Sequence, residues 1–223
     1  MKNAKIKWIF FDVGSTIVDE TLCHVRRFDA IEDEMKEKFG RRLSYEDELL
    51  PLIIKGAKAR TGYSPVRYAC DVLGLTFPLY PREYERPFPD AIPTLSALKT
   101  DYKLGIIANQ PKELEGALDE MGFSGLFERV FGSDDFGMEK PDPRFFEFAL
   151  CECGCAPREA VMIGDRIDND VTPAKAVGMR TVWVRRGFFG QDMPRNDAEI
   201  SDAEADSLFE LPDILRRLSG GEE

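Results

Sequence analysis

The stretch Lys5-Ile-Lys-Trp-Ile-Phe-Phe-Asp12 decides the fold, because it joins a run of apolar residues directly to a carboxylate. Its large apolar side chains, with no glycine or proline among them, predict a buried β-strand that ends at Asp12. Three later apolar segments have the same character, at 103–108, 160–163 and 180–184. Helical patterns lie between these segments. The alternation predicts an α/β fold, a Rossmann-like parallel sheet core with helices on both faces.

The predicted helices carry recognisable end signals. Asp142-Pro143 places an N-cap residue and a first-turn proline in front of the apolar positions of 145–150, and Gly154 closes that helix. Gly178 ends a shorter helical pattern in the same way. These signals support helices that return the chain from one parallel strand to the next.

The stretch from about residue 21 to 78 breaks this alternation, because helical patterns follow one another with no strand between them. Ser44-Tyr-Glu-Asp47 is typical of a capping box, and Ser64-Pro65 opens a further helix that ends at Gly74. This is more chain than one crossover connection needs, so we predict a small helical cap. The expected domains are a core of 1–18 and 82–223 and a cap of 19–81.

Polar residues stand where the apolar segments end, or in the loops that follow them. They are Asp12, Asn109, Lys140, Asp165 and Asp170. Ligands of open α/β sheets bind at the carboxyl ends of the strands. We therefore expect these residues to meet in one crevice.

The same residues lie in motifs that resemble a known family. Phe10-Phe-Asp-Val-Gly-Ser-Thr16 resembles the first motif of the haloacid dehalogenase-like superfamily, and Ile106-Ile-Ala-Asn109 stands where its second is expected. Glu139-Lys-Pro-Asp-Pro143 resembles the third motif and Ile163-Gly-Asp-Arg-Ile-Asp-Asn-Asp170 the fourth. The segment 178–184 is similar to the strand that follows. A helical insertion after the first motif is the family's usual position for a cap.

The resemblance implies a hydrolase, namely a Mg²⁺-dependent phosphatase that acts on a small phosphorylated molecule. Asp12 would attack phosphorus to give an aspartyl-phosphate that water then hydrolyses, while Lys140 neutralises charge on the transferred group. The implied Mg²⁺ ligands are Asp12, Asp165, Asp170 and the backbone carbonyl of Gly14. The implied phosphate-binding residues are Ser15, Thr16, Asn109, Gln110 and Lys140.

Two positions depart from the family pattern. Family phosphatases normally have a second aspartate where this chain has Gly14, and that aspartate protonates the leaving group and later activates water. A glycine does neither, so turnover is expected to be weakened. Ala108 stands where the second motif usually has threonine or serine, which removes one hydrogen bond to the phosphoryl group unless Asn109 or Gln110 replaces it.

These departures leave other functions open. Carbon–halogen or carbon–phosphorus cleavage is known on the same scaffold in family members that also lack the second aspartate. Those members have tyrosine or alanine there, which Gly14 does not match. The phosphonate-cleaving type also needs a lysine in the cap, for which Lys55 or Lys58 is only a nominal candidate. A catalytically weak or silent metabolite-binding protein is the remaining alternative.

The net charge, the apolar runs and the cysteines indicate which partners and which cellular compartment to expect. The formal net charge of −11 repels polyanions, so no nucleic acid partner is expected. No apolar run spans a bilayer and no secretory signal is visible, which predicts a cytoplasmic protein with no membrane partner. The five cysteines are expected to be reduced, and Cys151-Glu-Cys-Gly-Cys155 lacks the usual spacing of a zinc site. The arginine pairs at 26–27, 41–42 and 185–186 are expected in water, although each could equally reach a substrate carboxylate or phosphate. The oligomeric state stays open.

Overall fold

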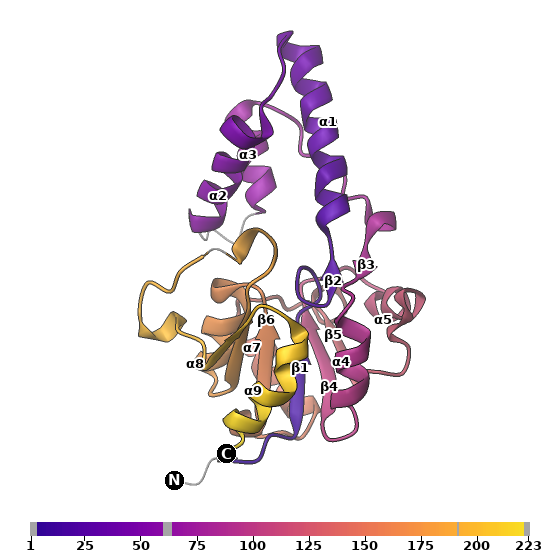
Figure 1. Cartoon of the computed structure of the whole chain (residues 1–223), viewed down its shortest axis with the longest axis vertical. Coiled ribbons are helices and arrows are strands. Elements are labelled where there is room, and N and C mark those ends of the chain that lie inside the picture. The colour runs from indigo at the N-terminus through magenta and orange to yellow at the C-terminus, as the bar shows by residue number, and fades with distance from the viewer. Residues whose placement is uncertain (1–3, 60–63, 191, 221–223) are drawn as a thin grey trace. The chain divides into compact units, whose positions relative to one another are not determined.

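A parallel sheet forms the centre of the larger part of the structure (Figure 1). The computed structural model describes residues 4–59, 64–190 and 192–220. In these ranges the sheet has six strands in the order β5-β4-β1-β6-β7-β8, and every neighbouring pair is parallel. The strands are β1 (Trp8–Phe11), β4 (Lys103–Ala108), β5 (Arg129–Gly132), β6 (Ala160–Gly164), β7 (Arg180–Val184) and β8 (Ala203–Ala205). The predicted parallel α/β core is confirmed.

The four inner strands are the four that the apolar segments predict, and the two edge strands were missed. Inner strands are covered on both faces and read as continuous apolar runs. The edge strand β8 has the sequence Ala-Glu-Ala, which contains no β-branched or aromatic residue. The other edge strand, β5, begins at the exposed Arg129 and ends at Gly132. Edge strands of this kind carry little signal in the sequence.

Successive side chains of β1 point to opposite faces of the sheet, as a strand requires. Ile9 and Phe11 pack with one set of helices, whereas Trp8 and Phe10 pack with another. The first face is covered by α4 (Ala91–Leu98), α5 (Leu114–Leu118) and α9 (Leu211–Leu218). The second face is covered by α7 (Pro143–Glu152) and α8 (Thr172–Ala176).

The helix that follows Lys140 begins as its sequence predicts. Asp142 is the N-cap of α7 and accepts a hydrogen bond from the backbone N–H of Arg144 at 2.9 Å, with Pro143 in the first turn. No helix in the described ranges is both long and apolar enough to cross a bilayer. The remaining helical turns around the sheet are α6 (Ser133–Phe136), η3 (Asp119–Phe123), η4 (Pro157–Glu159), η5 (Ile167–Val171), η6 (Gly187–Phe189), η7 (Asp197–Glu199) and η8 (Leu208–Glu210).

The chain divides into two compact units. One consists of Met1–Asp19 and Arg86–Glu223 and holds the large sheet, and the other is Glu20–Glu85. The chain leaves the first unit after β2 (Val18–Asp19) and returns to it at β3 (Arg86–Pro87). These two short strands pair with each other in antiparallel orientation. The second unit contains α1 (Thr21–Phe39), η1 (Tyr45–Leu49), α2 (Leu50–Ala59), α3 (Pro65–Leu73) and η2 (Arg82–Tyr84).

The helical unit has a small core of its own. Gly56 of α2 lies against Tyr68 of α3, and a Cβ at Gly56 would be 2.9 Å from that side chain. Ser44 caps η1 by accepting from the backbone N–H of Asp47 at 3.2 Å, as predicted. Arg27 was expected in water, but it is buried and its guanidinium donates to the carbonyl of Pro78 at 3.0 Å. The expectation for Arg27 was wrong because the carbonyl of Pro78, 51 residues away in the sequence, takes the place of water as the partner of the guanidinium.

Candidate active site

Three carboxylates meet at the carboxyl ends of the central strands. Asp12 directly follows β1, Asp165 directly follows β6, and Asp170 lies in η5. Each offers one oxygen, and these oxygens lie within 4.8 Å of one another. Because β1 and β6 are hydrogen-bonded neighbours in parallel register, their ends bring the first two carboxylates together.

Lys140 lies among these carboxylates with 2% of its surface exposed. Its Nζ is 2.6 Å from Oδ1 of Asp12 and 2.6 Å from Oδ1 of Asp170. Three carboxylates and one ammonium leave a formal charge of −2, since three negative charges meet one positive charge. A largely buried net charge of this kind is stabilised by a further cation or by protonation of a carboxylate.

The donor set fits a divalent metal ion. Carboxylate oxygens are hard ligands of the kind that Mg²⁺ prefers, and Mg²⁺ is usually held by one or two protein carboxylates with several waters. Two positive charges would neutralise the cluster of Asp12, Asp165, Asp170 and Lys140. Within the described residues this is the group whose acidic atoms are close enough to share an ion.

Burial and mutual repulsion change the proton affinity of the cluster. The pKa of Asp170 is raised to about 6, because full burial and the charge of Asp12 together outweigh the opposing effect of the Lys140 ammonium and of the hydrogen bonds to the carboxylate. Burial by itself would lower the pKa of Lys140, but the charges and hydrogen bonds of Asp12 and Asp170 outweigh it and raise that pKa. Lys140 is therefore a cation at neutral pH.

Asn109 holds Lys140 in place through its main chain. The side-chain Oδ1 of Asn109 accepts from the backbone N–H of Lys140 at 2.7 Å. The side-chain Nδ2 of Asn109 donates to the backbone carbonyl of Lys140 at 2.7 Å. The sequence assigned Asn109 to phosphate binding, whereas the structure uses its side chain to position the lysine. The second hydrogen of the amide is the donor that this side chain has left for a phosphate. Gln110 is half-buried, and its backbone carbonyl accepts from the hydroxyl of Ser133 at 3.1 Å.

The turn that follows Asp12 presents some predicted residues and hides another. Gly14 and Ser15 are half-buried, and Ser15 adopts a positive φ of 55°, whereas Gly14 does not have a positive φ. Thr16 is fully buried at 0% exposure. Its hydroxyl is buried without a hydrogen-bond partner, so its role in phosphate binding stays a prediction.

The fourth motif is shaped around Asp170. A Cβ at Gly164 would lie 2.3 Å from the carboxylate of Asp170, so only glycine fits at the end of β6. The same carboxylate accepts from the backbone N–H of Arg166 at 3.0 Å. The backbone carbonyl of Asp165 accepts from Nε1 of Trp183 at 2.8 Å. These bonds hold Asp165 and Asp170, the two residues of the motif that belong to the carboxylate cluster.

The segment after β7 also reaches the site, and sequence reasoning missed it. A Cβ at Gly187, whose φ is 62°, would lie 2.6 Å from Oγ of Ser15 and 3.9 Å from Oδ2 of Asp165. Phe189 stacks under the guanidinium of Arg166 at 4.4 Å. The available signal was the glycine after Arg185 and Arg186, at the carboxyl end of a predicted strand. The arginines instead favoured a solvated surface.

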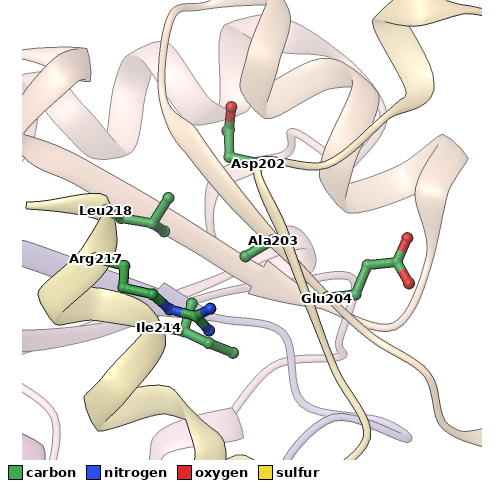
Figure 2. A pocket seen from close by; sticks show the side chains of 6 residues that line it. All are labelled: Asp202, Ala203, Glu204, Ile214, Arg217 and Leu218. Carbon is green, nitrogen blue, oxygen red and sulfur yellow. The ribbon is translucent and has the colours of Figure 1, made fainter. Parts of the chain in front are cut away.

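A separate pocket of about 420 Å³ lies between β8 and α9 (Figure 2). Its lining residues are Asp202, Ala203, Glu204, Ile214, Arg217 and Leu218, none of which belongs to the carboxylate cluster. Asp202 is engaged by the backbone N–H of Thr181 at 2.8 Å. This pocket is therefore a different site from the cluster of Asp12, Asp165, Asp170 and Lys140.

Comparison with known proteins assigns the family. The profile of the haloacid dehalogenase-like hydrolases matches residues 6–178. A glyceraldehyde 3-phosphate phosphatase of Pyrococcus furiosus is 32% identical over 98% of this chain and 96% of its own length. This chain therefore belongs to the haloacid dehalogenase-like hydrolase family, as its motifs predict.

Two further relatives have the same character. A glyceraldehyde 3-phosphate phosphatase of Methanopyrus kandleri is 40% identical over 61% of this chain and 59% of that protein. The crystal structure of a phosphatase of this family from Thermococcus onnurineus is similar with a TM-score of 0.68 and 30% identity, over 97% of this chain and 99% of that one. The relatives are phosphatases with a similar fold, and the carboxylate cluster described above is consistent with that class of enzyme.

Proposed function

We propose that this protein is a Mg²⁺-dependent phosphatase of small phosphorylated metabolites, with Asp12 as the nucleophile. The observation that carries the proposal is the position of Asp12, whose carboxylate is 2.6 Å from the buried Lys140 and next to two further carboxylates. The names of the relatives from P. furiosus and M. kandleri support the substrate class.

The residues divide the work according to their exposure. Asp165 and Asp170, with the backbone carbonyl of Gly14 and one oxygen of Asp12, would hold Mg²⁺. When bound, that ion supplies positive charge that screens the attacking carboxylate and the phosphoryl oxygens. Lys140 adds a fixed positive charge to the same place, and Asn109 keeps it there. Ser15, Asn109, Gln110 and Lys140 are the proposed phosphate contacts, and Thr16 stays a predicted one.

The proposed reaction has two steps. The free oxygen of Asp12 forms a bond to phosphorus while the bond from phosphorus to the ester oxygen breaks. The ester oxygen keeps the electron pair of that bond and leaves either as a stable anion or with a proton taken from water or from an acid. Water then attacks the aspartyl-phosphate, releases phosphate and restores the carboxylate. Gly14 contributes no proton to either step, so the leaving group must be stable as an anion or must be protonated by another group.

The unit Glu20–Glu85 is proposed as the cap that selects the substrate. Caps of this kind exclude water and complete the site when they close. We also propose a cytoplasmic location, for which the five unpaired thiols are a supporting observation, and no nucleic acid partner, for which the net charge of −11 is the reason.

A silent binding protein is the second candidate, and Gly14 is the observation that favours it. A screen of phosphorylated metabolites, with and without Mg²⁺ and with phosphate release as the readout, separates the two. We expect Mg²⁺-dependent release from at least one substrate. Metabolites that raise the melting temperature but release no phosphate would favour the binding protein.

The metal has its own test. Mg²⁺ should raise the melting temperature, because a ligand that binds the folded state stabilises it. Asp165→Asn should strongly reduce that rise, whereas Asp168→Asn should not, since Asp168 is in the same loop but pairs with Arg166. Equal rises in both variants would contradict the proposed metal ligands.

A further inference from the structure

Arg186 joins two segments that are far from it in the sequence: the turn after Asp12 (residues 13–18), called the nucleophile turn below, and Asp90. Nη1 of Arg186 donates to the backbone carbonyl of Thr16 at 3.3 Å, and Nη2 is paired with Oδ2 of Asp90. Its guanidinium lies over the ring of Phe88, 4.3 Å from the ring centre. The expectation that Arg186 is solvated was wrong, because only 13% of its side chain is exposed.

Asp90 is itself firmly held. It is the N-cap residue of α4, and its Oδ2 also accepts from the hydroxyl of Ser207 at 2.7 Å and from the backbone N–H of Leu208 at 2.9 Å. Burial alone would raise the pKa of Asp90, but the bonds from Arg186, Ser207 and Leu208 outweigh it and lower that pKa. Arg186 therefore pairs with a carboxylate that two adjacent residues of another segment, Ser207 and Leu208, also hold.

The turn that Arg186 contacts is held by its own backbone and, beside Arg186, by the backbone N–H of Phe88, which donates to the carbonyl of Ile17 at 3.0 Å. The carbonyl of Val13 accepts from the backbone N–H groups of Ile17 and Val18, both at 3.0 Å, which closes the turn from within. Ser15 adopts a φ of 55°, a conformation that costs a non-glycine residue energy. The next residue after Arg186 is Gly187, whose backbone lies against the Ser15 side chain. Arg186 and Gly187 thus brace the turn from outside.

We propose that Arg186 is a positioning residue of the active site, one that fixes the backbone of the nucleophile turn by holding the Thr16 carbonyl against the anchored Asp90. This inference rests on the proposed function, since the turn matters to catalysis only if Gly14 and Ser15 serve the metal and the phosphate. Arg186 touches neither of these ligands and acts through the backbone of Thr16.

Arginine suits this task and lysine does not. The two contacts use two different nitrogens of one planar group, Nη1 for the Thr16 carbonyl and Nη2 for Asp90. A lysine ammonium is a single point charge and does not reproduce the fixed fork of a guanidinium. Arg186→Lys should keep a positive charge beside Asp90, and hence the fold, while losing the hold on Thr16.

The test compares Arg186→Lys with Arg185→Lys in the full chain. Arg185 is the neighbouring residue but is exposed, and it pairs with Asp206 at the surface, which makes it the matched control. The readouts are melting temperature, the Mg²⁺ concentration that gives half of the thermal shift, and kcat and KM for para-nitrophenyl phosphate. This aryl phosphate needs no acid for its leaving group.

We expect Arg186→Lys to remain folded, to need about tenfold more Mg²⁺ for half of the shift and to lose about tenfold in kcat, the scale of one hydrogen bond to a charged group. KM should change little, and Arg185→Lys should match the wild type throughout. Values within twofold of Arg185→Lys would overturn the inference, and so would a lower melting temperature with unchanged Mg²⁺ dependence and kcat. A wild type with neither Mg²⁺ shift nor turnover would overturn the proposed function, and this inference with it.

A second variant covers the case in which Arg186→Lys does not fold. The double variant Asp90→Asn with Arg186→Gln removes both buried charges at once, so that no buried charge is left without a partner. It should fold, yet show the same tenfold losses in Mg²⁺ dependence and kcat. A folded double variant with wild-type Mg²⁺ dependence and kcat would overturn the inference.

Discussion

The loop after β1 and the loop after β6 both supply carboxylates, but they hold them differently. In the loop after β6, the side chain of Asp170 is 1% exposed and is bonded to Lys140 and to the backbone of Arg166. In the loop after β1, the side chain of Asp12 is 15% exposed. Both carboxylates contact the same ammonium, so contact with Lys140 does not distinguish them. Exposure does, because only the carboxylate that solvent reaches can meet a substrate.

The difference assigns roles that a list of acidic residues does not. The β6 loop is packed around its acidic residues, with Gly164 leaving space for Asp170 and Trp183 bonded to the carbonyl of Asp165. Such a loop holds charge at fixed positions. In the β1 turn Gly14 and Ser15 are half-buried, so under the proposed function this turn would present its groups to a ligand. The predictions that follow test this separation, from the largest effect to the smallest.

Asp12→Asn should abolish turnover of any active substrate, by a factor of about 10⁴ or more, as loss of a catalytic nucleophile does. The fold should survive, because the variant leaves Lys140 paired with Asp170 and removes one negative charge from a crowded site. Phosphate release and melting temperature are the measurements. Turnover that persists in a folded Asp12→Asn protein would show that the exposed carboxylate is not the nucleophile.

Gly14→Asp should raise turnover of alkyl phosphates by about 10²–10⁴-fold, the usual worth of general acid–base help, with little gain for aryl phosphates. Gly14 does not have a positive φ, so an aspartate there meets no penalty from that source. The measurement is kcat/KM for one alkyl and one aryl phosphate, with the melting temperature as a check on the fold. An equal gain on both substrates, or none, would argue against a missing acid.

Asn109→Ala should lower kcat by about 10–100-fold, because it removes both bonds that hold the main chain of Lys140. A buried polar group left without its partner costs about 1–3 kcal/mol, so the melting temperature should fall as well. Lys112→Ala, at an exposed position of the same loop, is the control and should change neither quantity. A drop in stability with unchanged kcat would mean that Asn109 supports the fold and not the lysine's catalytic position.

The Mg²⁺-induced rise in melting temperature should grow as the pH goes from 5 to 7. Asp170 has a pKa of about 6 in the metal-free protein, above its ordinary value. Between the ordinary pKa of 3.8 and the raised value of about 6, the folded state binds more protons than the unfolded state. The contribution of Asp170 to the stability of the metal-free protein is therefore lost as the pH rises through 6. Mg²⁺ binds the deprotonated form and restores that loss. A thermal shift that is the same at pH 5 and pH 7 would contradict the assigned role of Asp170.

Much of the fold could be predicted because its signals are local. The inner strands are continuous apolar runs, and the start of α7 is written in Asp142 and Pro143. The edge strands β5 and β8 could not be found in this way, because partial exposure removes the apolar run. The division of the chain into Met1–Asp19 with Arg86–Glu223 and Glu20–Glu85 depends on which residues contact each other, and periodicity only suggests it.

The sequence by itself determined the family, the parallel core and the carboxylates of the site, because Asp12, Asp165 and Asp170 stand at strand ends or within one short loop. Only the tertiary structure showed the partners of Asn109 and Arg186 and the burial of Thr16. Asn109 bonds Lys140 across 31 residues, and Arg186 bonds Asp90 across 96 residues and Thr16 across 170. Such partners are brought together only by folding, and burial replaces water with them, so neither residue type nor spacing announces them.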